Sequence, residues 1–237
     1  MKNEILLYCF PYSGASASFY LGWSAKLDER IKIIPVEYPG RGSRFGEKTC
    51  DSMDELAESV LAVLKKNGTE NCAFFGHSLG GLVAFEVFHK LKEKGESLPR
   101  HLFLSGSTPP HIKYGEEMLH LLPDNEFLMS LVELGGMNEE VMNNRELIKL
   151  YLPVIRSDYR IYELYEPKER DPLHVDFTVL TGSEDVISNE TGMTEWNKYT
   201  DRGVEIKKIE GNHFFIHDHP DMIARIIEAA LLDGGTK

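Results

Sequence analysis

The chain has 237 residues, of which 42% are hydrophobic and 27% charged, and its net charge is −12 at pH 7. This composition is typical of a globular protein with a large apolar core, and it excludes disorder, collagen-like repeats and coiled coils. The acidic balance argues against nucleic acid as a partner, because phosphate binding needs a basic surface.

The cysteines and the apolar runs point to an intracellular setting. Cys9, Cys50 and Cys72 are too few and too irregularly spaced for a disulfide scaffold or a zinc site, which suits a reducing compartment. No apolar run approaches the roughly 18 residues of a membrane span, and the first residues lead into a strand rather than a signal peptide. We therefore expect a cytoplasmic protein that does not contact a membrane.

The first part of the chain alternates between predicted strands and predicted helices. The strands are expected at residues 5–10, 31–36, 72–75 and 101–105, and the helices at 17–27, 53–66 and 79–94. Apolar strands without alternation are typical of parallel strands that are covered on both faces. The order predicts an α/β fold with a mostly parallel central sheet, right-handed crossovers and helices on both faces.

Residues 109–166 interrupt this alternation. No strand is predicted there, only helical segments around 126–134, 138–143 and 145–165, with the last one interrupted by Pro153. Helices inserted between two sheet strands build a lid, and six side chains could line its inner surface: Leu131, Leu134, Met137, Leu150, Leu152 and Tyr162.

Alternation resumes after this insertion. A strand is predicted at 175–180, a helix at 190–199, a strand at 204–209 and a final helix at 221–232. We expect a single domain over residues 1–237 that carries the lid as an insertion.

A serine between glycines lies where a predicted strand meets a predicted helix. Residues 76–81 read Gly-His-Ser-Leu-Gly-Gly, with Ser78 between the apolar run 72–75 and the helical run 79–94. A sharp strand-to-helix turn of this kind exposes a nucleophilic serine, and its glycines avoid collisions in the crowded turn. Chance produces the bare pattern in roughly one chain in twelve of this length, so the reading depends on suitable partners elsewhere.

The chain contains candidates for both partners. A serine hydroxyl needs an imidazole to accept its proton, and the imidazole needs a carboxylate to fix its tautomer. In the α/β-hydrolase arrangement these residues follow in the order Ser, Asp or Glu, His, each just beyond a strand. Asp185 follows the strand 175–180 and His213 follows the strand 204–209. This order predicts a serine hydrolase.

Other residues compete for these roles, and a further loop is a candidate for oxyanion binding. The competitors are Glu184, His77, His217 and His219. The histidines read as structural or surface residues, and no H-E-x-x-H spacing indicates a metal site. The small-residue loop 11–15 after the first strand is either half of an oxyanion hole or a simple tight turn.

Six segments over nearly the whole chain carry motifs that together resemble one family. They are Cys-Phe-Pro-Tyr-Ser-Gly at 9–14, Tyr-Pro-Gly-Arg-Gly-Ser-Arg at 38–44, Phe-Gly-His-Ser-Leu-Gly-Gly at 75–81, Leu-Gly-Gly-Met at 134–137, Leu-Pro-Val-Ile-Arg-Ser-Asp-Tyr at 152–159 and Gly-Asn-His-Phe-Phe at 211–215. The chain resembles the type II thioesterases that accompany non-ribosomal peptide and polyketide synthases, within the α/β-hydrolase fold. It departs from that pattern at Ser13, Ala15 and Val186.

The resemblance implies a role for each candidate residue. Ser78 would be the nucleophile, His213 the base and Asp185 the carboxylate that orients it. The backbone N–H groups of Tyr12 and Leu79 would form the oxyanion hole. The implied activity is the hydrolysis of acyl or aminoacyl thioesters from the phosphopantetheine arms of carrier proteins in antibiotic-type biosynthesis. It implies no cofactor of the enzyme's own and no metal, and we expect a monomer.

Two other functions stay open on the sequence. Fold and triad do not fix the substrate, so a carboxylesterase, lipase or peptidase is possible, as is a non-catalytic binding protein on the same scaffold. The loop 38–44 is either a solvated turn or a contact for an anion such as phosphopantetheine. Candidates for a carrier-docking patch are Arg41, Arg44, Arg156 and Arg160, although Arg156 fits an ordinary structural salt bridge better.

Overall fold

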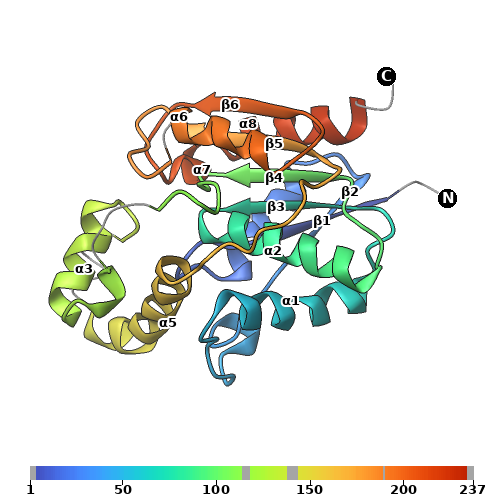
Figure 1. The fold of residues 1–237 in the computed structure, drawn as a ribbon. Helices are drawn as coiled ribbons and strands as arrows, with labels where there is room; N and C mark the ends of the chain where they lie inside the picture. Colours follow the sequence, from blue (N-terminus) through green and yellow to red (C-terminus); the bar gives the residue numbers. More distant parts are fainter. Residues whose placement is uncertain (1–3, 114–117, 138–143, 189, 234–237) are drawn as a thin grey trace.

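A six-stranded parallel sheet forms the centre of the molecule (Figure 1). The computed structural model describes residues 4–113, 118–137, 144–188 and 190–233. The strands lie in the order β2-β1-β3-β4-β5-β6, and each neighbouring pair is parallel. Their bounds are β1 Ile5–Phe10, β2 Ile31–Pro35, β3 Cys72–His77, β4 His101–Ser105, β5 Asp176–Gly182 and β6 Val204–Ile209. The predicted mostly parallel sheet is confirmed.

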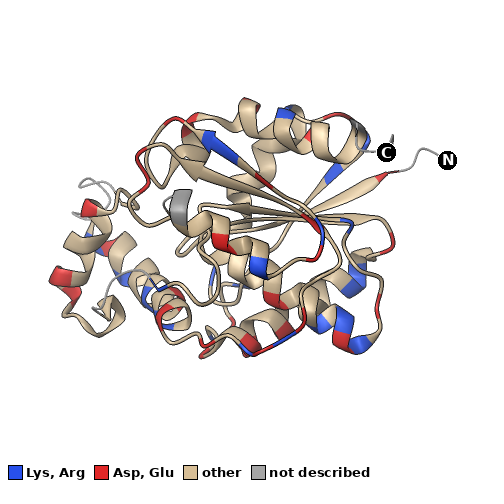
Figure 2. Cartoon of the chain, turned by 45° about the horizontal axis from the view of Figure 1, so that its top comes forward, with Lys and Arg blue, Asp and Glu red and all other residues tan. Residues whose placement is uncertain are grey.

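The central strands are apolar because both faces of the sheet are covered. Phe74 and Phe75 are neighbours in β3 and fully buried, yet they belong to different apolar cores on opposite faces. The strands β1, β3 and β4 carry no Lys, Arg, Asp or Glu, and in Figure 2 the charged residues lie mainly on the surrounding helices and loops. Parallel strands buried on both sides read as such continuous apolar runs.

Helices cover both faces, as the sequence predicts. The first core packs the sheet against α1 and α2, and the second packs it against η1 and α8. The bounds of the covering elements are η1 Ala17–Ala25, η2 Gly42–Arg44, α1 Met53–Asn67, α2 Leu79–Lys94, α6 Glu190–Met193, η4 Thr194–Lys198, α7 Phe215–Asp218, α8 Pro220–Glu228 and η5 Ala229–Asp233. Ser52 caps α1 by accepting the N–H of Glu55, and Gly95 ends α2 in the left-handed conformation.

The insertion after β4 forms a helical lid at the end of the sheet toward which the strands point (Figure 1). Its elements are η3 Leu119–Leu121, α3 Asp124–Glu133 and α5 Arg145–Glu163, and the described part of the insertion contains no strand. A small apolar core holds α3 and α5 together through Phe127, Leu131 and Ile155. The expected helical segment 138–143 lies outside the described residues.

Several helices differ from the sequence-based expectation. The segment expected at 17–27 is a 3₁₀-helix that ends at Ala25, the helix expected at 190–199 divides into α6 and η4, and the last helix continues from α8 into the π-helix η5. Pro153 does not interrupt α5, which is continuous from Arg145 to Glu163. Pro153 is exposed while Leu152 and Val154 are buried, so packing on either side holds the helix together.

Candidate active site

Ser78 lies in the sharp turn between β3 and α2 and has an unusual backbone conformation. Its φ is 53° and its ψ is −120°, and among the described residues it is the only one besides glycines with positive φ. A Cβ on Gly76 would lie 2.2 Å from the carbonyl oxygen of Gly80, and one on Gly80 would lie 2.2 Å from that of Phe10. The two glycines therefore let α2 start directly against β3 and β1, which forces the strained turn.

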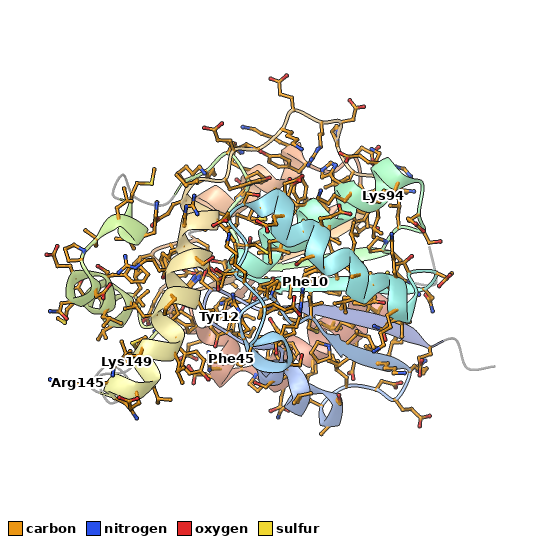
Figure 3. All side chains as sticks on the ribbon, turned by 90° about the horizontal axis from the view of Figure 1, so that it is seen from below. Phe10, Tyr12, Phe45, Lys94, Arg145 and Lys149 are labelled. Atoms are coloured by element: carbon orange, nitrogen blue, oxygen red, sulfur yellow. The ribbon has the colours of Figure 1, made fainter. Side chains whose placement is uncertain are left out.

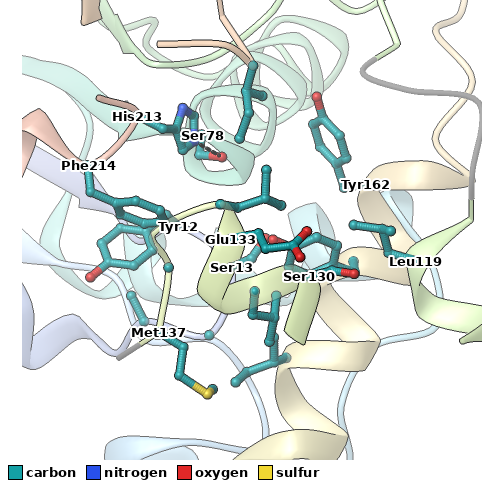
Figure 4. A pocket seen from close by; sticks show the side chains of 18 of the residues that line it. Tyr12, Ser13, Ser78, Leu119, Ser130, Glu133, Met137, Tyr162, His213 and Phe214 are labelled. Carbon is teal, nitrogen blue, oxygen red and sulfur yellow. Dashed lines mark hydrogen bonds between the residues drawn. The ribbon is translucent and has the colours of Figure 1, made fainter. Parts of the chain in front are cut away.

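The structure brings Ser78, His213 and Asp185 together at the ends of three strands, and Figure 4 shows the contact between Ser78 and His213. The Oγ of Ser78 lies 3.0 Å from Nε2 of His213, and Nδ1 of His213 lies 2.8 Å from Oδ2 of Asp185. Because a carboxylate can only accept, Nδ1 carries the proton and Nε2 is left free to accept the hydroxyl proton of Ser78. The geometry allows His213 to act as a base toward Ser78.

Asp185 is held in one orientation by the turn that follows it. Its Oδ1 accepts the N–H groups of Ile187 and Ser188 at 2.8 and 2.9 Å, and its Oδ2 accepts the Ser188 hydroxyl as well as His213. Burial alone would raise the pKa of Asp185, but the hydrogen bonds from His213 and Ser188 outweigh it and lower that pKa below its ordinary value. Asp185 is therefore a charged acceptor for His213.

Ser188 is a residue that the sequence analysis did not single out. It is fully buried and binds Asp185 through both its N–H and its hydroxyl. The only sequence signal is the Asp-x-x-Ser spacing, in which an Asp side chain accepts from the backbone two and three residues on. That spacing is common in loops, so it does not indicate a functional role by itself.

The competing residues lie elsewhere. Glu184 is exposed, whereas Asp185 is buried. His217 is hydrogen-bonded through Nε2 to the hydroxyl of Tyr12 at 2.9 Å, and His219 stands at the start of α8.

His77 is fully buried against the site without taking part in the Ser78 hydrogen bond. Its Nδ1 lies 2.9 Å from the Ser105 hydroxyl, and its ring centroid lies 5.2 Å from that of His213. Burial first, and then the neighbouring His213, lower the pKa of His77 well below its ordinary value. A neutral imidazole beside His213 avoids a second positive charge at the site.

The predicted oxyanion donors come from two adjoining segments. Leu79 is the first residue of α2, where backbone N–H groups have no acceptor within the helix. The N–H of Tyr12 donates to no acceptor among the described residues. The close approach of Gly80 to the carbonyls of Phe10 and Pro11 places the two segments against each other. Both N–H groups are thus unused next to Ser78, and their role as oxyanion donors stays a prediction.

A cavity of about 580 Å³ lies between Ser78 and the lid (Figure 4). Four of the six predicted lid residues line it: Leu131, Leu134, Met137 and Tyr162. The other two do not, because Leu150 is 51% exposed and Leu152 is buried in the lid core. The wall is mostly apolar, and Glu133 and Glu163 also line it. Such a cavity can hold an acyl chain next to the serine.

The four arginines proposed for docking all have acidic partners. Arg41 is only 3% exposed and pairs with Asp158, so the interpretation of Arg41 as a solvated or docking residue is wrong. Arg156 pairs with Asp124 and donates to two lid carbonyls, a structural role. Arg44 pairs with Glu47 and Arg160 with Asp51, both at the surface.

Within residues 4–113, 118–137, 144–188 and 190–233, no three His, Cys, Asp or Glu side chains are grouped so that they could hold a metal ion. No helix in the described part of the chain combines the length and the apolar character needed to cross a bilayer.

The parallel sheet, the sharp turn at Ser78 and the lid define an α/β-hydrolase fold. The chain belongs to the thioesterase family, whose domain model matches residues 6–231. It is 37% identical to LgrE of Brevibacillus parabrevis over 97% of this chain and 89% of that protein. It is 33% identical to the thioesterase PikA5 of Streptomyces venezuelae over 98% and 82%. LgrE carries the name linear gramicidin dehydrogenase, whereas PikA5 and the matching family model are both described as thioesterases.

Solved structures agree with this assignment. ClbQ from the colibactin non-ribosomal peptide and polyketide pathway is 33% identical and superimposes with a TM-score of 0.93 over 97% of this chain and 98% of that one. The type II thioesterase BorB from the borrelidin cluster is 34% identical, with a TM-score of 0.88 over 98% and 94%. The chain is therefore an enzyme that hydrolyses thioester bonds.

Proposed function

We propose that this protein is a type II thioesterase that removes acyl or aminoacyl groups from the phosphopantetheine arms of carrier proteins. Ser78, His213 and Asp185 would be its catalytic triad, and it would need no cofactor of its own. The observation that carries the proposal is the Ser78–His213–Asp185 chain of hydrogen bonds below a lidded, mostly apolar cavity. The carrier-bound substrate is supported by the similarity to ClbQ, which comes from a non-ribosomal peptide and polyketide pathway.

In the acylation step, the Oγ of Ser78 attacks the thioester carbonyl carbon while Nε2 of His213 takes the hydroxyl proton. The carbonyl oxygen becomes negatively charged and is stabilised by the N–H groups of Tyr12 and Leu79. When the C–S bond breaks, the phosphopantetheine thiolate leaves and takes its proton from His213. A thiolate is a good leaving group, so proton donation by His213 matters less for this step than it would for an amine leaving group.

In the deacylation step, a water molecule replaces the departed thiol. His213 takes a proton from that water, which attacks the acyl carbon of the ester on Ser78. The C–O bond to Ser78 then breaks and the Oγ regains its proton from His213. The products are a free acid and a carrier whose thiol can be loaded again.

The test compares carrier-bound acyl thioesters with oxygen esters of the same acyl chain. We expect the protein to prefer the carrier-bound thioester, and Ser78→Ala to lower the rate by about 10⁴-fold or more, since the triad acts as a unit. A preference for the free oxygen ester would instead indicate a carboxylesterase. An unchanged rate in Ser78→Ala would refute the assigned nucleophile, and a wild-type protein that a fluorophosphonate fails to label at Ser78 would contradict a serine mechanism.

A further inference from the structure

Asp158 is a buried carboxylate on the lid helix α5, outside the triad. Only 1% of the residue is exposed. Its Oδ2 and Oδ1 accept bidentate hydrogen bonds from Nη1 and Nη2 of Arg41, both at 2.6 Å. A third donor, the backbone N–H of Gly14, lies 2.7 Å from Oδ2. A buried ion pair often adds little net stability, because taking both charges out of water is costly. Stability alone therefore does not explain why Asp158 also binds the Gly14 N–H.

Gly14 belongs to the loop after β1 that also carries Tyr12. The loop is tied on one side by Glu37, which accepts the hydroxyl of Ser16 and the N–H of Ala17. Nearer Tyr12, Asp158 accepts the Gly14 N–H and Arg41 donates to the Ala15 carbonyl at 3.2 Å, in addition to the hydrogen bond between the Tyr12 hydroxyl and His217. The lid helix therefore holds the part of the loop that lies two residues from the predicted oxyanion donor.

Side-chain packing also places Gly14 against α5. Gly14 has a φ of +79°, and a Cβ there would lie 2.8 Å from the side chain of Ile155, one turn before Asp158 on α5. Figure 3 shows α5 passing beside the labelled Tyr12, with Arg145 and Lys149 at its other end. The half of α5 that carries Asp158 therefore packs against the loop.

We propose that Asp158 is a positioning residue for the hydrolysis, and that it acts by fixing the Gly14 N–H and through it the aim of the Tyr12 N–H at the oxyanion. This inference rests on the proposed function. It makes the lid part of the catalytic apparatus as well as the cover of the cavity. A misplaced oxyanion donor lowers the rate of the chemical step more than it weakens substrate binding.

The chain offers matched variants. Replacing Asp158 alone would leave Arg41 as an unpaired buried charge, so the comparison is made in the background of the substitution Arg41→Met. In that background Asp158→Asn keeps an acceptor for the Gly14 N–H, whereas the similarly shaped Asp158→Leu does not. We expect the kcat of Arg41→Met/Asp158→Leu to be about 10- to 100-fold below that of Arg41→Met/Asp158→Asn, with KM values within about threefold.

A single substitution keeps the question answerable if the Leu variant does not fold. Asp158→Glu retains a carboxylate for Arg41 but moves it by one methylene relative to Gly14, and we expect its kcat to fall about tenfold. The control is Ser157→Ala, which removes a different tie of the same helix turn, the hydroxyl bond to the Cys50 carbonyl at 2.9 Å. Ser157→Ala should keep the wild-type kcat.

Binding of a boronic acid separates positioning from mere stability. An alkyl boronic acid forms a tetrahedral adduct on Ser78 with an oxygen where the oxyanion would lie. We expect the affinity for the boronic acid to be lower in the Leu variant than in the Asn variant, by about the same factor as kcat. The affinities of the two variants for a non-hydrolysable thioether analogue of the substrate should agree within about threefold.

Equal kcat values in the Asn and Leu variants, equal boronate affinities, or an equally large loss in Ser157→Ala would each overturn the inference. A wild-type protein that neither hydrolyses carrier thioesters nor binds the boronate at Ser78 would overturn the proposed function instead. The two failures are therefore distinguishable.

Discussion

At the scale of single residues, the site depends on a serine held in a conformation that serine does not favour. A non-glycine residue with a φ of 53° and a ψ of −120°, which lies outside the ordinary left-handed region because of its ψ, costs on the order of 1–3 kcal/mol. The surrounding close contacts at Gly76 and Gly80 impose that conformation, since neither position has room for a Cβ. The strain keeps the hydroxyl of Ser78 between His213 and the cavity.

Gly80→Ala tests how tightly the turn is fixed. The new methyl group would lie 2.2 Å from the Phe10 carbonyl oxygen, so α2 must move away from β1. We expect the free energy of unfolding to fall by about 3 kcal/mol and hydrolysis to fall with it. Urea unfolding and carrier-thioester hydrolysis measure the two effects. Gly22→Ala, at a position with open space around it, should lower neither.

Ser188→Ala tests the support of Asp185. The variant removes one hydroxyl donor but keeps both backbone N–H bonds, so Asp185 stays charged and is less firmly oriented. We expect kcat to fall about tenfold with KM unchanged, because the orientation of His213 matters most in the transition state. Ser59→Ala on α1, which removes the hydroxyl bond to the Leu56 carbonyl, is the control. A rate equal to that of the control would show that Ser188 has no part in orienting Asp185.

At the scale of elements, the sheet was predictable because its strands carry a strong local signal. The apolar runs that become β3 and β5 are bounded by polar or glycine-rich loops, β6 alternates apolar and charged residues over most of its length, and residues after parallel strands meet at one edge. The order of Ser78, Asp185 and His213 after such strands was therefore sufficient to place them together. Ser188 was missed because its contact depends on the local turn rather than on the strand pattern.

The lid was less predictable for two physical reasons. Helical periodicity shows that α5 has an apolar side, but not which side chains face the cavity and which face α3, as Leu150 and Leu152 illustrate. Arg41 lies in a loop rich in Gly and Pro, and such a composition predicts a solvated side chain. Its partner Asp158 is 117 positions further along, and no local pattern connects the two.

Pro153→Ala tests why α5 stays continuous. Proline within a helix removes one hydrogen bond and costs up to about 3 kcal/mol relative to alanine. Pro153 is exposed, so replacing it removes no buried contact. We expect the free energy of unfolding to rise by about 1–2 kcal/mol with little change in hydrolysis. Urea denaturation measures this, and a destabilised variant would mean that the helix needs the proline.

At the scale of the whole molecule, buried histidines link stability to pH. Burial is the main cause that lowers the pKa values of His89 and His101 from 6.5 to about 4. As the pH falls below about 6.5, the unfolded chain binds protons at these rings while the folded chain does not. Their contribution to stability is therefore complete above pH 6.5 and is lost as the pH falls toward 4.

We expect the free energy of unfolding to fall by up to about 5 kcal/mol between pH 7 and pH 4.5 on account of these two histidines. Urea denaturation at both pH values measures the total change, which includes other groups. The double variant His89→Gln/His101→Gln isolates the share of the two rings, because its unfolding free energy should depend less on pH. An equal dependence in both proteins would contradict the assignment.

The distance along the chain between Ser78 and His213 bears on how the enzyme is made. The two residues are 135 positions apart, and β6 precedes His213 directly. At about 5–20 residues per second, a ribosome needs on the order of ten seconds to reach the histidine after the serine has been made. During that interval the nascent chain carries a serine without its base, so hydrolytic activity begins only after His213 has been made.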